Sequence, residues 1–109
     1  MLDKQRMFDE CILRHLGSYE AQGVATGTVL CAAFACMRER LTAANATPDD
    51  VAAFVAVIER AINNHPSLAL PQYAQDKADL QRMLQWTFNE MPCDVNRPLK
   101  LNFLNGLRF

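Results

Sequence analysis

The sequence predicts an all-α fold, a four-helix, mostly antiparallel, bundle-like domain with an extended C-terminal arm. Apolar residues recur at helical spacing in three separate segments of the chain. A further segment, at about residues 21–44, contains an uncharged run rich in small residues, typical of a helix buried in the middle of a core. Helical periodicity stops after residue 91. We therefore divide the chain into a helical domain (1–91) and a non-helical arm (92–109).

The first helix is predicted over residues 3–16. One face carries the residues spaced at i, i+3, i+4, i+7 and i+8, namely Phe8, Cys11, Ile12, His15 and Leu16. Gly17 follows where a left-handed C-terminal cap belongs, so we expect the helix to end there.

The second helix, at about residues 21–44, is predicted to be central. It begins between residues 21 and 28, and Thr26 as an N-cap would leave residues 23–25 as a loop. Small residues form one ridge that lets a neighbouring backbone approach closely, and bulky residues form another that fills wider gaps. The small ridge is Gly23, Gly27, Cys31 and Ala35, and the bulky ridge is Leu30, Phe34, Met37 and Leu41. The uncharged run is shorter than the roughly 20 residues of a membrane span.

The third helix has the clearest start. Thr47 suits the N-cap, Pro48 the first helical position, and Asp49 and Asp50 the positive end of the helix dipole. The residue before Pro66 disfavours helical geometry, so the helix ends at residues 63–66. Its predicted inner stripe is Val51, Phe54, Val55, Ile58, Ala61 and Ile62, and its outer face is Ala52, Ala53, Ala56, Arg60 and Asn63.

The fourth helix is predicted over residues 72–91, closed by Pro92. Its inward face is Tyr73, Leu80, Met83, Leu84, Thr87, Phe88 and Met91. At about 100° per residue, Trp86 points away from that face, on the polar side of the helix. An indole there needs a cover, either from the arm of the same chain or from a partner.

The arm alternates apolar and polar residues, as an extended segment does. Leu99, Leu101 and Phe103 are the apolar positions, and Asn105-Gly106 is a turn dipeptide. The arm is mildly basic and the third and fourth helices are mildly acidic, so we expect the arm to lie across them or to add to a partner.

The composition limits the classes of function. Half of the residues are hydrophobic and the formal net charge is −1, which counts against a dedicated nucleic-acid binder with its basic stripe. The N-terminal residues show no apolar signal-peptide core, so we expect a cytoplasmic protein with four reduced cysteines. No cofactor motif occurs, and we expect neither a cofactor nor an enzymatic activity.

Two groups of residues are candidates for chemistry. Cys11 and His15 lie one turn apart and could supply two zinc ligands or a thiol–imidazole pair, but core or interface packing explains them better. The acidic residues either start the third helix or, like Asp76, Asp79 and Glu90, are assigned to a solvated face. We expect no catalytic residue and no metal.

DNA binding is the alternative function. The predicted fourth helix carries groups able to read base edges, namely Gln75, Gln81, Arg82, Gln85 and Asn89. Acidic residues lie among them, which disfavours a nucleic-acid interface.

The function expected first is that of a small cytoplasmic protein-interaction module, such as a regulator, inhibitor, adaptor or chaperone. Trp86 and Arg82 are the side-chain types that dominate interface hot spots. The expected partner-binding residues are Trp86, Arg82, Leu99, Leu101 and Phe103. The partner is a protein, including a second copy in a homodimer, and neither nucleic acid nor a membrane.

Overall fold

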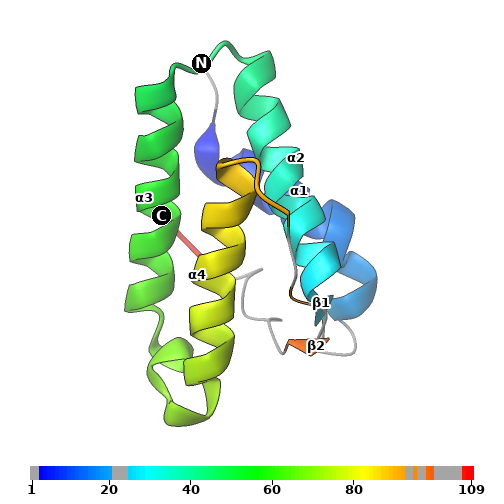
Figure 1. The fold of residues 1–109 in the computed structure, drawn as a ribbon, viewed down its shortest axis with the longest axis vertical. Helices are drawn as coiled ribbons and strands as arrows, with labels where there is room; N and C mark the ends of the chain where they lie inside the picture. Colours follow the sequence, from blue (N-terminus) through cyan, green and yellow to red (C-terminus); the bar gives the residue numbers. More distant parts are fainter. Residues whose placement is uncertain (1–2, 21–24, 93–94, 96–97, 100–106) are drawn as a thin grey trace.

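A computed structural model describes residues 3–20, 25–92, 95, 98–99 and 107–109. These residues contain four α-helices, α1 (Lys4–Glu20), α2 (Gly27–Ala43), α3 (Pro48–Asn64) and α4 (Ala74–Phe88). Successive helices run antiparallel, and α2 contacts both α1 and α4 (Figure 1). The all-α bundle is therefore confirmed. Two short 3-10 helices, η1 (Pro66–Ala69) and η2 (Pro71–Tyr73), connect α3 to α4.

The central helix packs through its bulky ridge. All four ridge residues are buried in the core, namely Leu30, Phe34, Met37 and Leu41. The helix begins at Gly27, the later of the two predicted starts, and residues 21–24 lie outside the described part. None of the described helices is long and apolar enough to cross a membrane.

The small ridge of α2 receives the arm at Gly27. A Cβ atom added there would lie 1.9 Å from the Val95 carbonyl oxygen, so no side chain fits at that position. Just before the helix, β1 (Ala25–Thr26) pairs antiparallel with β2 (Pro98–Leu99), with Ala25 opposite Leu99. The close approach predicted for the small residues is therefore made by the extended arm.

The first helix is longer than predicted. It runs on to Glu20, so the expected end at Gly17 is wrong. A glycine inside a helix costs only about 1 kcal/mol relative to alanine. The rest of α1 packs along α2, and this packing outweighs the local preference.

The start of α3 is confirmed in atomic detail. The Asp50 backbone N–H donates to Thr47 Oγ1, and the Thr47 backbone N–H donates to Asp50 Oδ2, both at 3.1 Å. These reciprocal bonds form a capping box that satisfies two otherwise unpaired donors. The helix stops at Asn64, and His65 before Pro66 is extended as expected.

The fourth helix is shorter than predicted, which moves Met91. The helix ends at Phe88, and Glu90 then takes a positive φ of 57° that redirects the chain. Met91 is 52% exposed, so its assignment to the inward face is wrong. Leu80, Met83, Leu84 and Thr87 are buried as predicted.

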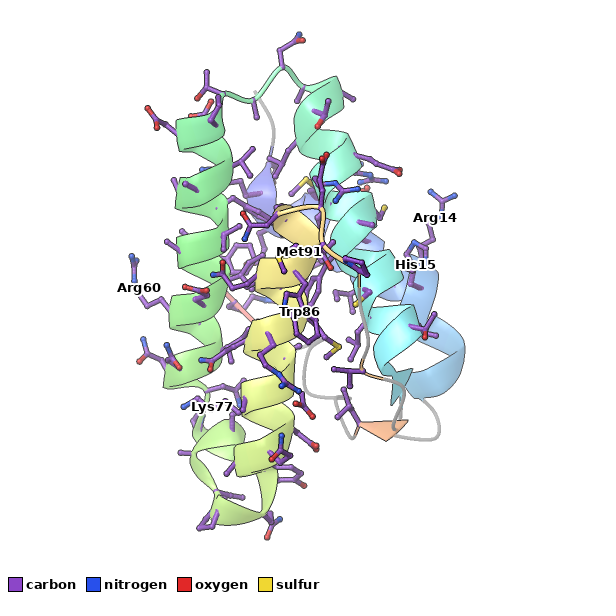
Figure 2. All side chains as sticks on the ribbon, viewed as in Figure 1. Arg14, His15, Arg60, Lys77, Trp86 and Met91 are labelled. Atoms are coloured by element: carbon purple, nitrogen blue, oxygen red, sulfur yellow. The ribbon has the colours of Figure 1, made fainter. Side chains whose placement is uncertain are left out.

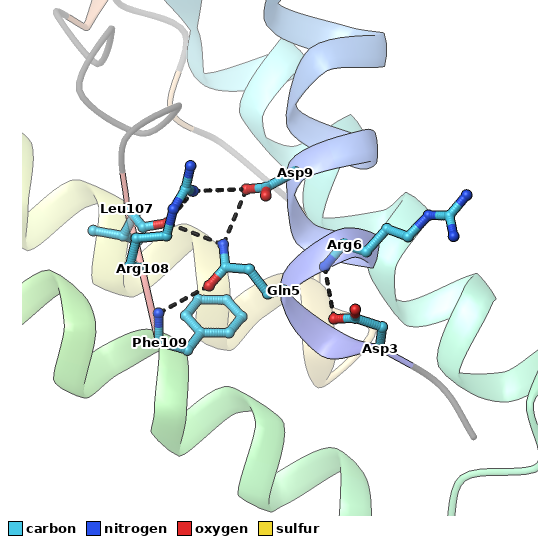
Figure 3. A network of polar contacts seen from close by, with 7 residues as sticks. All are labelled: Asp3, Gln5, Arg6, Asp9, Leu107, Arg108 and Phe109. Atoms are coloured by element: carbon cyan, nitrogen blue, oxygen red, sulfur yellow. Dashed lines mark hydrogen bonds and ion pairs between the residues drawn. The ribbon is translucent and has the colours of Figure 1, made fainter.

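The described end of the arm packs between α1 and α3. The Phe109 ring lies 5.1 Å from Phe8 and 6.0 Å from Phe54, centroid to centroid. Gln5 holds the backbone beside it: its Nε2 donates to the Leu107 carbonyl at 3.1 Å, and its Oε1 accepts the Phe109 N–H at 2.9 Å (Figure 3). The arm and the helices therefore share one core.

The charge of the arm meets α1. Arg108 pairs with Asp9 at 3.3 Å, where we expected basic arm residues to lie on the two acidic helices (Figure 3). The balance of charge predicted a contact with the bundle but not which helix makes it. The Asn105-Gly106 turn lies outside the described residues.

Candidate interaction surface

Trp86 lies half-buried on α4 and is covered on one side by its own helix. The Arg82 guanidinium stands 5.2 Å from the indole ring centroid, a cation–π distance. Arg82 Nη2 also pairs with Asp79 Oδ1 at 2.5 Å. This geometry follows from helical spacing, since residues three and four apart lie on one face.

Asp79 anchors this arrangement from inside the protein. It is only 2% exposed, so its assignment to a solvated face is wrong. Its Oδ1 also accepts a hydrogen bond from Gln75 Nε2 at 3.1 Å. A buried carboxylate needs such partners, because an unpaired buried charge is costly.

A hollow of about 580 Å³ opens where α2, α3 and α4 meet, and we call it the α3 hollow. Val51, Val55 and Phe88 supply its apolar lining. The exposed Ala52 and Ala56 leave room because their side chains are short. The remaining lining residues are Arg38, Thr42, Ala46, Pro48, Glu59, Gln85, Asn89 and Glu90.

A second hollow of about 400 Å³ lies between α2 and the turn after α4, and we call it the α2 hollow. Arg38 and Glu90 line both hollows, so the two adjoin. Arg38 Nη1 donates to the Thr87 carbonyl oxygen at 2.5 Å and fixes the boundary between them. The other lining residues are Cys31, Ala35, Met91 and Pro92.

Met91 links these hollows to Trp86. Its backbone N–H donates to the Trp86 carbonyl at 2.7 Å, and Figure 2 shows both side chains on the same side of the molecule. We call the two hollows together with Met91 the α4-end surface. Its lining is aliphatic, aromatic and amide in character, with a few charged groups at the rim, which suits docking of an apolar segment.

The sequence did not predict the α3 hollow. Ala52 and Ala56 look like an ordinary solvent face, and the short end of α4 was missed with Met91. The run of alanines on the outer face of α3 was the available signal, since alanine leaves space that a longer side chain would fill.

The predicted partner-binding residues fall into three groups. Trp86 and Arg82 lie next to the α4-end surface. Leu99 is buried in the core of its own chain. Leu101 and Phe103 lie outside the described residues, so a cover for Trp86 from that part of the arm stays a prediction.

Cys11 and His15 do not form a site in the described structure. Burial, followed by the hydrogen bond to Cys36, raises the pKa of the Cys11 thiol to about 12. A nucleophilic cysteine needs the opposite shift. Among the described residues, no cluster of three or more His, Cys, Asp or Glu could hold a metal ion.

The expectation of four reduced cysteines is wrong for Cys31, which is disulfide-bonded. Cys11 and Cys36 are free thiols. The spacing of cysteines along one sequence does not reveal their redox state, and the expectation rested only on the N-terminal residues.

The amide groups considered for DNA reading are paired within the chain. Gln81 donates to Asn63 at 2.7 Å, and Gln85 donates to Glu59. These bonds tie α4 to α3. No observation therefore favours the DNA-binding alternative.

Comparison with known protein families, curated proteins and solved structures gives no match for this chain.

Proposed function

We propose that this protein is a non-enzymatic protein-interaction module that binds an apolar segment of a partner at the α4-end surface. The observation that carries the proposal is the pair of adjoining hollows beside the exposed Met91. Binding pockets typically enclose about 300–1,000 Å³ and combine an apolar lining with a few polar groups. The α3 hollow has this size and this composition.

The side chains around the hollows support binding of protein. Methionine adapts its shape to irregular apolar surfaces and is frequent at binding sites. Tryptophan and arginine are enriched among the residues that contribute most to interface affinity. Trp86 with Arg82 therefore serves as a rigid flank for a partner seated beside Met91.

The rim charges orient the segment. Glu59 and Glu90 line the α3 hollow with Arg38 as the facing cation. Charges at a rim steer and select a partner more than they add affinity. The proposed segment is apolar along its length and carries basic groups that face the two glutamates.

Two substitutions on α3 test the proposal directly. Ala52→Arg and Ala56→Arg fill the α3 hollow with a long charged side chain while keeping good helix formers on an exposed face. Ala53→Arg is the matched control, because Ala53 is exposed on the same helix and does not line the hollow. We expect the first two to lower partner binding at least tenfold and the control to keep it.

The binding measurement has two arms. Affinity capture from nuclease-treated lysate with wild-type protein and each variant tests a different protein as partner. Sedimentation velocity over a range of concentrations tests a second copy. If wild type and all three variants capture the same proteins and self-associate equally, the α4-end surface is not the binding site.

A further inference from the structure

Two free thiols face each other across the contact between α1 and α2. The Cys11 thiol donates to Cys36 Sγ with the two sulfur atoms 2.9 Å apart. A disulfide bond is about 2.05 Å long, so a small movement of the side chains brings the two atoms to bonding distance. No other residue has to leave the space between them.

The surroundings hold the two helices in register. Glu10 and Arg40, each one to four residues from a cysteine, form an ion pair of 2.5 Å between α1 and α2. Cys11 is fully buried and Cys36 is 8% exposed. The sulfur atoms therefore meet inside a fixed helix pair, with Cys36 the one closer to solvent.

We propose that Cys11 and Cys36 form a latent disulfide, a two-electron oxidation site that covalently joins α1 to α2 when a small peroxide reaches the core. Cys31 on the same α2 is disulfide-bonded, so disulfide chemistry is already compatible with this fold. The site is independent of the α4-end surface.

Hydrogen peroxide supplies the oxidant, and the step balances. Cys36 Sγ attacks one peroxide oxygen as the thiolate, the O–O bond breaks, and the other oxygen leaves as water after taking up the thiol proton. This converts Cys36 to a sulfenic acid. Cys11 Sγ then attacks Cys36 Sγ, the S–O bond breaks, and the hydroxyl leaves with the Cys11 proton as a second water. Two thiols lose two electrons, and one peroxide becomes two waters.

The high pKa of Cys11 makes this reaction selective. A neutral buried thiol reacts slowly with external disulfides and alkylating reagents, because the thiolate is the nucleophile. A sulfenic acid formed on Cys36 is already in contact with Cys11 and condenses before larger reagents can reach it.

The disulfide would stabilise the protein. It closes a loop between positions 25 residues apart in the chain, which removes conformational freedom from the unfolded state. For a chain of this size we expect the midpoint of thermal unfolding to rise by about 10 °C on oxidation.

The test treats the full-length protein with hydrogen peroxide, alkylates remaining thiols in denaturant and maps cysteine peptides by mass spectrometry. We expect a cross-linked peptide pair joining Cys11 to Cys36, two hydrogens lighter than the free peptides, together with the higher unfolding midpoint. Cys36→Ala is the control, in which oxidation should give neither the cross-link nor the rise.

The wild-type mapping does not depend on the variant, so the test stands even if Cys36→Ala unfolds. Recovery of Cys11 and Cys36 as alkylated thiols after peroxide treatment would overturn the proposal. Recovery of Cys36 as a sulfinic acid, or joined to a cysteine other than Cys11, would overturn it equally.

Discussion

The α1–α2 pair and the α3–α4 pair are built differently. The first is closed, with facing sulfur atoms inside and the Glu10–Arg40 ion pair outside. The second is joined partly through exposed amide side chains, and together with α2 it leaves the α3 hollow open. The difference teaches that one half of the bundle provides rigidity while the other half keeps a surface for binding.

The strongest way to break this comparison is to remove one phenylalanine from each half. Phe34 of α2 is fully buried, so Phe34→Ala should lower the free energy of unfolding by about 4 kcal/mol. Phe88 is half-buried and lines the α3 hollow, so Phe88→Ala should cost about 2 kcal/mol. Urea unfolding of both variants measures the two losses. Equal losses would show that the two halves are equally closed.

Replacing the small residue at the start of α2 comes next. Gly27→Ala places a methyl group against the Val95 carbonyl, and the arm must move away. We expect a loss of about 2 kcal/mol from this overpacking, measured as a lower urea midpoint. A loss below about 0.5 kcal/mol, the usual range for surface sites, would mean that the arm adjusts freely and is not part of the closed half.

The buried carboxylate on α4 sharpens the comparison from the open side. Asp79→Ala removes the acceptor of Arg82 and Gln75 and should cost about 2 kcal/mol. Freed from this anchor, Arg82 should leave the indole, which would change Trp86 fluorescence. Asp79→Asn keeps one oxygen acceptor and should show a smaller loss. Unchanged fluorescence in Asp79→Ala would contradict the anchoring role.

The exposed ion pair of the closed half should give the smallest effect. Hydrogen bonds from Arg40, and then from Arg6, hold the pKa of Glu10 below its ordinary value of 4.5. A lowered folded-state pKa gives stability that is present above about pH 4.5 and is lost as the pH falls through the folded-state value. Glu10→Gln should therefore lower the unfolding midpoint slightly at pH 7 and not at pH 3. A difference that persists at pH 3 would assign the effect to packing.

The sequence predicted the elements whose signals are local. The start of α3 depends on Thr47, Pro48 and Asp50, which lie within four positions, and the capping box formed as expected. The bulky ridge of α2 and the buried positions of α4 follow from periodicity alone. These features do not depend on which helix packs against which.

The errors arose where distant parts of the chain decide. Gly17 remains helical because α1 packs along α2, and Met91 is exposed because the chain turns at Glu90. The Cys11–Cys36 contact joins residues 25 positions apart, so it depends on how two helix faces meet. The α3 hollow likewise requires three helices. A single sequence carries little information on such arrangements.

The pairing of Ala25 with Leu99 has a consequence for how the molecule assembles. It closes a loop that spans most of the chain, and the entropic cost of closure must be met before the contact contributes any stability. The helices, by contrast, form from neighbours in sequence and meet through short turns. We therefore expect the arm to join late in folding, with the Val95–Gly27 contact as a slow closing step. Until that step the groove along the small residues of α2 is open to solvent, so the folding intermediate is the species most exposed to aggregation.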